Sequence, residues 1–313
     1  MSRLFVTLAL VGLLFGAAVV AQGRMMPIRE ASVLVPKGSI YYKTIGTGQP
    51  ILIIHGGPGM DHRYLYPHLV DLARDHRLIF YDQRGTGASQ CKLTDKTVNI
   101  EQFVRDIDAV RRHLGLNRIN ILGHSWGGLL GVHYTVRHPL NVRSLMLINS
   151  SGLTGESQKE FFDNLDKMRS EEEKEEIKAI DKDPAYIAGD LDLYKRRSEL
   201  QIKPYFFDLE KLPKLAYEVS PLTVKNNEQV RTWIWRQLLQ YDLRPQASRI
   251  RAPTFILHSD HDVIPVSVAE ETSETIPRST LVVMKDNGHY SFVEQNKEFL
   301  EEVRKFLKTV RGP

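Results

Sequence analysis

Cysteine is almost absent from this chain of 313 residues, in which Cys91 is the only one. A single cysteine cannot form an intrachain disulfide, so the fold must rely on its hydrophobic core even in an oxidising compartment. Hydrophobic residues make up 42% of the chain, which is enough for such a core. Cys91 follows a glycine-rich turn and has no neighbour that would activate a thiol, so we interpret it as structural.

A concentrated patch of one charge is also missing. The net charge is +4, but the 42 Lys and Arg residues are interspersed among 38 acidic residues rather than gathered in a stripe or an arm. We therefore expect no nucleic-acid partner. His258, Asp260, His261 and Asp262 lie close together in the sequence, but their spacing fits no zinc pattern. We expect neither a metal ion nor another cofactor.

The N-terminus carries a long apolar run, residues 4–20, which follows Arg3 and precedes small residues. This pattern is typical of a secretory signal peptide cleaved after Ala21. The alternative is an uncleaved anchor, because the run is nearly as long as the roughly 20 residues of a membrane helix. We expect residues 1–21 to be a signal peptide or anchor and the protein to be exported, periplasmic or secreted. It would contact a membrane only if this segment is retained.

Residues 22–151 alternate between short apolar runs rich in β-branched residues and helical patterns. In residues 100–115, for example, apolar side chains recur at Phe103, Ile107 and Val110. Such alternation implies βαβ crossovers and an α/β fold, with a mostly parallel sheet and helices on both faces. The expected strands are 39–46, 50–57, 76–85, 118–125 and 142–150, and the expected helices are 64–75, 100–115 and 126–138.

The alternation stops between residues 152 and 247, where no run predicts a buried strand. We interpret this segment as a helical insertion, the cap, and its charge-dense part, residues 167–183, as a solvated helix face. Residues 248–313 resume the core. They contain two expected strands, within 252–262 and 279–289, and a closing amphipathic helix, 292–310.

The segment INILGHSWGGLLG, residues 119–131, places Ser125 between Gly123 and Gly127, after an expected strand and before an expected helix. This context is typical of a nucleophile held on a sharp turn above a sheet. A serine hydroxyl is a weak nucleophile until a base can take its proton, and the base needs an orienting carboxylate.

His289 is the candidate base, because it lies just beyond the last expected strand. His55 and His124 lie inside turn motifs, and we interpret them as structural. Asp260 and Asp262 both qualify as the acid. We favour Asp262, because a few residues usually separate the strand end from the acid, whereas Asp260 lies at the strand's edge.

An oxyanion hole needs preorganised backbone N–H groups where negative charge develops. One donor should be the residue after the nucleophile, Trp126. The other should come from HGGPG, residues 55–59, which follows an apolar strand. Gly57 is the candidate there.

Four motifs occur in a fixed order: HGGPG at 55, DQRGTGAS at 82, GHSWGG at 123 and GHYSFVE at 288. With them the chain resembles the proline iminopeptidase family of the α/β-hydrolase fold, over Ser32 to about Ser151 and from Arg251 onward. The resemblance implies that the cap covers the site and that the DQRG turn is architectural. It also implies a triad and an oxyanion hole at the residues already singled out, namely Ser125, Asp262 and His289, with Gly57 and Trp126.

Two departures concern the acid and the substrate amine. Ser259 stands where the family usually has a glycine three residues before the acid. Aminopeptidases of the family bind the free amine of the substrate with acidic side chains, and in some members one of these directly follows the catalytic Asp, where this chain has Val263. The cap offers other acids without indicating which of them face the site, namely Glu199, Glu210, Glu218 and Glu228.

These observations predict an exported serine hydrolase that acts through an acyl-enzyme. The first hypothesis is an aminopeptidase that releases N-terminal proline or another small apolar residue from peptides. The second is an esterase, lactonase or amidase that acts on small apolar substrates, and the third is a non-catalytic binding protein of the same fold. Epoxide hydrolases and dehalogenases carry Asp where this chain has Ser125, so they are disfavoured.

Overall fold

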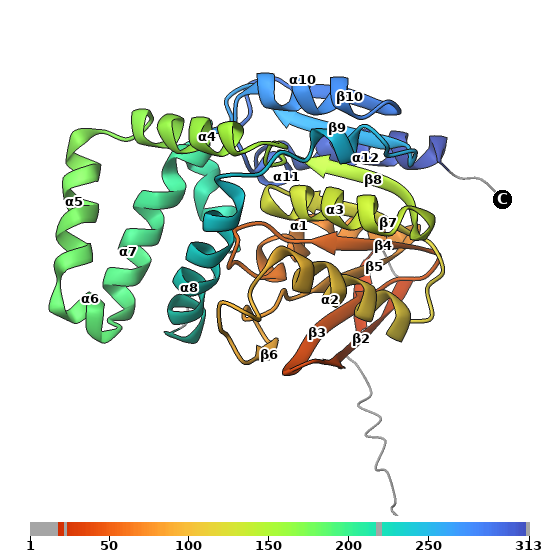
Figure 1. Cartoon of the computed structure of the whole chain (residues 1–313), viewed down its shortest axis with the longest axis horizontal. Helices are drawn as coiled ribbons and strands as arrows, with labels where there is room; N and C mark the ends of the chain where they lie inside the picture. The colour runs from red at the N-terminus through yellow and green to blue at the C-terminus, as the bar shows by residue number, and fades with distance from the viewer. Residues whose placement is uncertain (1–17, 22–23, 217–220, 311–313) are drawn as a thin grey trace, which may run out of the picture.

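The computed structural model describes residues 18–21, 24–216 and 221–310 (Figure 1). The predicted leader falls mostly on residues 1–17, which lie outside the described residues; Ala18–Ala21 form the short strand β1. Across the described part of the chain, no helix combines the length and apolarity needed to cross a membrane. Export therefore stays a prediction from the sequence.

One sheet forms the centre of the molecule, with strand order β1-β2-β3-β5-β4-β7-β8-β9-β10. Neighbours from β5 to β10 are parallel, whereas β1, β2 and β3 pair antiparallel, as do β3 with β5 and β3 with the short β6. The bounds are Arg24–Val35 for β2, Gly38–Ile45 for β3, Gln49–Ile54 for β4, His76–Tyr81 for β5, Gln90–Cys91 for β6, Ile119–His124 for β7, Val142–Ile148 for β8, Thr254–Ser259 for β9 and Ser279–Met284 for β10.

Alternate residues of the strands enter two separate hydrophobic clusters, one on each face. In β4, Leu52 and Ile54 pack with helices α2 (Ile100–His113) and α3 (Trp126–Arg137), whereas Ile51 and Ile53 pack with α1 (Tyr66–Leu69), α11 (Ser291–Glu294) and α12 (Asn296–Thr309). This is the period-two burial of a strand covered on both sides. The predicted α/β fold with helices on both faces is confirmed.

Local details differ from the expectations. The helix expected over 64–75 is broken into 3₁₀ turns at His62–Tyr64 and Val70–Arg74 around α1, which has a proline at its start. Strand β2 was not predicted, because Pro27 and the charged residues after it interrupt its apolar pattern. Helix α10, Val266–Thr275, was not predicted either.

The segment between β8 and β9 is helical and has no strand among its described residues apart from an isolated bridge between Thr154 and Asp242. Figure 1 shows α4 to α8, coloured green to teal, gathered beside one end of the sheet. Because parallel strands end at the same edge, the loops after β4, β7, β9 and β10 meet there. The bounds are Gly155–Lys167 for α4, Glu171–Lys182 for α5, Pro184–Ala188 for α6, Leu191–Ile202 for α7, Pro221–Leu238 for α8 and Arg244–Ala247 for α9.

A buried ion pair fixes helix α2 to the turn after β5. Arg84 Nε and Nη2 donate to the two carboxylate oxygens of Asp106 at 2.9 and 2.7 Å, and both side chains are at most 1% exposed. Burial raises the pKa of Asp106, and Arg84 opposes that effect only in part. The pair therefore matters most when one partner is lost, because the other is then left buried and unpaired.

We predict that Arg84→Met lowers the free energy of unfolding by about 3–5 kcal/mol, the usual cost of leaving one member of a buried pair alone. The matched control is Arg105→Met on α2, which breaks an exposed pair with Glu101 and should cost about 0–1 kcal/mol. Urea titration followed by circular dichroism measures both. Equal losses in the two variants would contradict the prediction.

Candidate active site

Ser125 lies on a strained turn between β7 and α3. Its backbone has φ 57° and ψ −126°, a left-handed conformation that is uncommon for a residue with a side chain. The neighbouring glycines permit the turn: a Cβ on Gly123 would lie 2.3 Å from the carbonyl oxygen of Gly127, and one on Gly127 would lie 2.2 Å from that of Ile54. The GxSxG spacing is thus required by backbone packing.

His289 and Asp262 form a buried hydrogen-bonded pair. His289 Nδ1 lies 2.8 Å from Asp262 Oδ1 and 3.0 Å from Oδ2. The carboxylate also accepts hydrogen bonds from Ile264 N–H at 3.0 Å and from Asn149 Nδ2 at 2.7 Å. With Nδ1 donating to Asp262, the Nε2 atom of His289 is left as the acceptor, as a general base requires.

Asp262 is held in its ionised form. Burial raises the pKa of this carboxyl, but the charge and hydrogen bond of His289, with further help from His258 and from Ile264 N–H, outweigh burial, so the pKa lies below its ordinary value. The His258 Nε2 atom is bonded to the carbonyl oxygen of Ile264, which leaves that ring in place beside Asp262. An ionised acid here stabilises an imidazolium on His289.

Asp260, the other candidate acid, has different partners. It bonds with His261 Nδ1 at 2.8 Å, accepts from Asn287 N–H at 3.4 Å and lies 3.6 Å from the Lys285 ammonium. These contacts tie together the loops after β9 and β10. The structure brings Asp262 and not Asp260 to His289.

A chain of hydrogen bonds connects the HGGPG loop to His289 through His124. Gly56 N–H donates to Tyr64 Oη at 2.7 Å, Tyr64 Oη lies 2.7 Å from His124 Nδ1, and His124 Nε2 lies 3.0 Å from the carbonyl oxygen of His289. The chain is satisfied when His124 is neutral, protonated on Nε2 only. Burial, reinforced by His289, lowers the pKa of His124 far below its ordinary value. His124 thus keeps one tautomer and supports the backbone of His289.

The two candidate oxyanion donors lie on either side of Ser125. Gly57 has φ 119° and lines the same pocket as Ser125, and Trp126 is the first residue of α3. Within the described chain, neither backbone N–H donates a hydrogen bond to a protein acceptor, so both are available to a ligand. The indole of Trp126 points away from the pocket: it is fully buried, packs on Phe103 and donates to Gln83 Oε1 at 2.8 Å.

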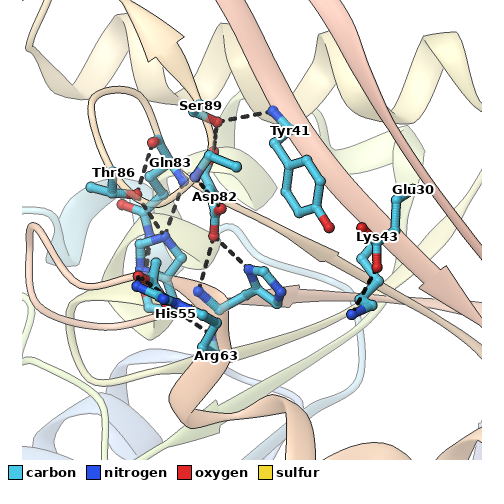
Figure 2. A network of polar contacts seen from close by, with 12 residues as sticks. Glu30, Tyr41, Lys43, His55, Arg63, Asp82, Gln83, Thr86 and Ser89 are labelled. Carbon is cyan, nitrogen blue, oxygen red and sulfur yellow. Dashed lines mark hydrogen bonds and ion pairs between the residues drawn. The ribbon is translucent and has the colours of Figure 1, made fainter. Parts of the chain in front are cut away.

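Gln83 joins this indole to the HGGPG loop. Its backbone N–H donates to His55 Nε2 at 3.0 Å, and its side-chain Nε2 donates to the carbonyl oxygen of His55 at 2.6 Å. Figure 2 shows Gln83 and His55 in contact, with Thr86 beside them. The DQRG turn therefore holds the loop that follows β4 against the first residue of α3.

Asp82 organises the same turn from its other side (Figure 2). Its oxygens accept from His62 N–H at 3.0 Å, from His62 Nδ1 at 2.6 Å and from Ala88 N–H at 2.8 Å. Ligand atoms of Asp61, His62 and Asp82 lie within 4.8 Å of one another, which is close enough for a metal ion. However, Asp61 is paired with Arg63 at 2.6 Å, and the Asp82 oxygens already have donors, so the cluster is satisfied by protein partners.

A pocket of about 380 Å³ lies between these loops and the helices that follow β8. Ser125 and His289 line it together, and no Asp or Glu of the described chain does so. Of the cap acids noted in the sequence, Glu199, Glu210 and Glu228 are exposed elsewhere, and Glu218 lies outside the described residues. The pocket is lined by Gly57, Pro58, Met60, His124, Ser125, Ser151, Phe161, Phe162, Leu165, Arg169, Gln201, Ile202, Tyr205, Asn227, Arg231, Trp235, His289 and Tyr290.

Several residues that build or support the candidate site belong to no sequence motif. Asn149, Tyr64 and Tyr205 act through contacts between segments far apart in the chain. The sequence contains one pattern that could have pointed to pocket-lining residues. In α8, Asn227, Arg231 and Trp235 recur at four-residue spacing and therefore share one helix face. That spacing alone does not say what the face covers.

Most of the chain matches a known protein family. A family model described as the alpha/beta hydrolase fold matches residues 49–295. The proline iminopeptidase of Lactobacillus crispatus (strain ST1) is 28% identical over 85% of this chain and 94% of its own length.

Solved structures agree on the fold. The proline iminopeptidase of Mycobacterium smegmatis superposes with a TM-score of 0.68 at 20% identity, over 90% of this chain and 98% of its own. Est816, an N-acyl homoserine lactone degrading enzyme, superposes with a TM-score of 0.66 at 21% identity, over 88% of this chain and 100% of its own. At these identities the solved structures show a shared fold and do not indicate the substrate.

We predict that Asp262→Asn lowers the free energy of unfolding by about 2–3 kcal/mol at pH 7, because hydrogen bonds to a buried charge are lost. The folded-state pKa of Asp262 lies below its unfolded value of about 3.9. The ionised carboxylate therefore contributes fully to the free energy of unfolding at pH values above the unfolded-state pKa. This contribution is lost as the pH falls through the folded-state pKa. Urea titrations between neutral pH and pH 3 should show the gap between wild type and variant closing.

The control is Asp260→Asn, which removes a carboxylate that is 17% exposed and should cost less than about 1 kcal/mol. A gap for Asp262→Asn that stays constant into acid, or equal losses for the two variants, would contradict the assignment.

Proposed function

This chain belongs to the α/β-hydrolase fold family, and on that basis we propose that it is a serine hydrolase in which Ser125, His289 and Asp262 form a catalytic triad. The observation that carries the proposal is the bond of His289 to buried Asp262 beside a pocket that Ser125 also lines. The strained turn at Ser125 supports it, because strain of this kind is characteristic of a nucleophile elbow.

The proposed reaction has two halves. His289 takes the proton of Ser125 Oγ as the oxygen attacks the substrate carbonyl, and it then gives that proton to the leaving group. The resulting acyl-enzyme is hydrolysed by a water molecule that His289 activates. The backbone N–H groups of Gly57 and Trp126 stabilise the oxyanion in each half, and loss of one such donor typically costs about 10²-fold to 10³-fold in kcat.

For the substrate, we propose short peptides from which N-terminal proline or another small apolar residue is released. Support comes from the similarity to proline iminopeptidases over most of both chains. The pocket is also suited to a small apolar group, since Phe161, Phe162 and Trp235 form an aromatic wall.

A second candidate, an esterase, lactonase or amidase, is favoured by one specific observation. A free amine is a cation, and aminopeptidases that recognise it need an acidic group near the scissile bond. Among the described residues no carboxylate lines the pocket. An uncharged ester, lactone or amide needs no such group.

We predict that a fluorophosphonate probe labels the full-length protein and that Ser125→Ala abolishes the labelling, because the probe reacts only with an activated serine. Ser151→Ala, which removes the other serine lining the pocket, should retain it. In-gel fluorescence and mass spectrometry of the labelled peptide provide the measurement. Absence of labelling in the wild type would support a non-catalytic binding protein instead.

The substrate class is tested by comparing prolyl-p-nitroanilide, its N-acetyl derivative and p-nitrophenyl butyrate. If the chain is an aminopeptidase, acetylation should reduce kcat/KM by about 10²-fold or more, because the binding energy of a charged amine, about 3 kcal/mol, is lost. Ser125→Ala corrects for background hydrolysis. If acetylation has no effect while the ester is hydrolysed, the aminopeptidase hypothesis is wrong and the second candidate stands.

A further inference from the structure

The pocket contains two guanidinium groups, Arg169 and Arg231, and no carboxylate from the described residues to balance them. Arg169 follows helix α4, and Arg231 lies on helix α8 between Asn227 and Trp235. Both side chains are partly buried, so each guanidinium has lost part of its hydration and is stabilised by a partner. The question is which partner these two have.

Arg169 is only partly satisfied by the protein. Its Nη2 donates to the carbonyl oxygen of Gln201 at 3.3 Å, and its Nε is buried with no hydrogen-bond partner among the described residues. The nearby acids are already committed, since Asp166 pairs with Lys174 and Glu173 pairs with Lys203. Burial accordingly lowers the pKa of Arg169 from its ordinary value.

Arg231 lines the pocket, and no Asp or Glu among the described residues lines it with Arg231. Its position one helical turn after Asn227 and one turn before Trp235 places it on the face of α8 that lines the pocket. Arg236, on the same helix, is exposed and does not line the pocket.

Tyr205 connects the two arginines with His289 in the same pocket. Tyr205 lines the same pocket as Arg169 and Arg231. Burial raises the pKa of Tyr205 to about 12, and the two arginine charges both act to lower it. Tyr205 is itself fixed to His289: its carbonyl oxygen accepts from His289 N–H at 2.7 Å, and the two ring centroids are 5.1 Å apart. The two arginines therefore share one pocket with Ser125, His289 and the tyrosine that holds the backbone of His289.

We infer that the substrate carries an anionic group, most simply a carboxylate, which Arg169 and Arg231 bind while the aromatic wall takes its apolar part. This inference rests on the proposed serine hydrolase and narrows its substrate class. Guanidinium groups suit carboxylates because their planar donors match the two oxygens. A protonated amine at the same place would be repelled.

The carboxylate has two chemical sources. It belongs either to the acyl part, as in a monoester of a dicarboxylic acid, or to the leaving group, as in the free C-terminus of a dipeptide. Both present the same group to the two arginines, so matched substrate pairs are needed to tell them apart.

The test measures kcat and KM for two such pairs. The acyl pair is mono-p-nitrophenyl glutarate against p-nitrophenyl pentanoate, and the leaving-group pair is prolyl-glycine against prolyl-glycinamide. We expect the charged member of one pair to be preferred by about tenfold to a hundredfold, the value of a charge-assisted hydrogen bond. Added salt should weaken the preference.

The variants are Arg169→Met, Arg231→Met and the double variant, with Arg236→Met as the matched control. We expect each single variant to reduce the preference by about tenfold, mainly through KM, and the double variant to abolish it. Arg236→Met should behave as wild type. Far-UV circular dichroism and urea titration show that each variant is folded. Turnover of p-nitrophenyl pentanoate by Arg236→Met, an exposed position outside the pocket, should stay within about threefold of wild type.

A binding measurement separates this inference from the proposed function. Calorimetry with Ser125→Ala compares 4-phenylbutyrate with 4-phenylbutyramide and requires no catalysis. Tighter binding of the carboxylate, lost in the double arginine variant, supports the inference even if the wild type hydrolyses none of these substrates. Equal binding of acid and amide, equal kinetics within both substrate pairs, or a preference that survives in the double variant would overturn it.

Discussion

The reactive end of this molecule depends on how closely the first turn of α3 approaches the end of β4. A methyl group on Gly127 would lie 2.2 Å from the carbonyl oxygen of Ile54, so only glycine allows the contact. The approach places the loop beginning at His55 directly beside Ser125 and leaves the serine in its strained conformation. Backbone packing therefore positions the proposed nucleophile and the proposed oxyanion donors.

Buried polar groups then hold this arrangement. Gln83 joins His55 to Trp126, His124 joins Tyr64 to the backbone of His289, and Asn149 bonds to Asp262. Each of these bonds is shielded from water, where a satisfied hydrogen bond confers rigidity and an unsatisfied one is costly. The supporting residues thus do as much to orient the proposed triad as its members do.

Features that depend on a local sequence pattern could be predicted from the sequence. Apolar periodicity located the parallel strands, and GxSxG between a strand and a helix located Ser125. Chain order and loop length were enough to prefer Asp262 over Asp260, and the structure places Asp262 against His289. The broken helix after HGGPG was mispredicted, because a local pattern does not reveal how a proline-containing turn is divided.

Other features were out of reach because they depend on distance in three dimensions. Asn149 meets Asp262 across 113 positions of the chain and Tyr64 meets His124 across 60. The sequence also could not predict the positive charge of the pocket, because nothing in it distinguishes Arg169 and Arg231 from the other Lys and Arg residues, 42 in all. Only the folded structure brings these two arginines together in one pocket. The acids that did stand out in the cap sequence are exposed elsewhere wherever the structure describes them.

The insertion between β8 and β9 delays the synthesis of the residues that would activate Ser125. Strands β8 and β9 are neighbours in the sheet, yet more than a hundred residues separate them, and Asp262 and His289 both lie beyond that gap. Domains generally fold as units, and a chain is made from its N-terminus onward. Ser125 is therefore synthesised long before Asp262 and His289, and the growing chain holds a serine without a base. In the proposed enzyme, reactivity arises only when β9 and β10, with the loops that carry Asp262 and His289, have joined the sheet.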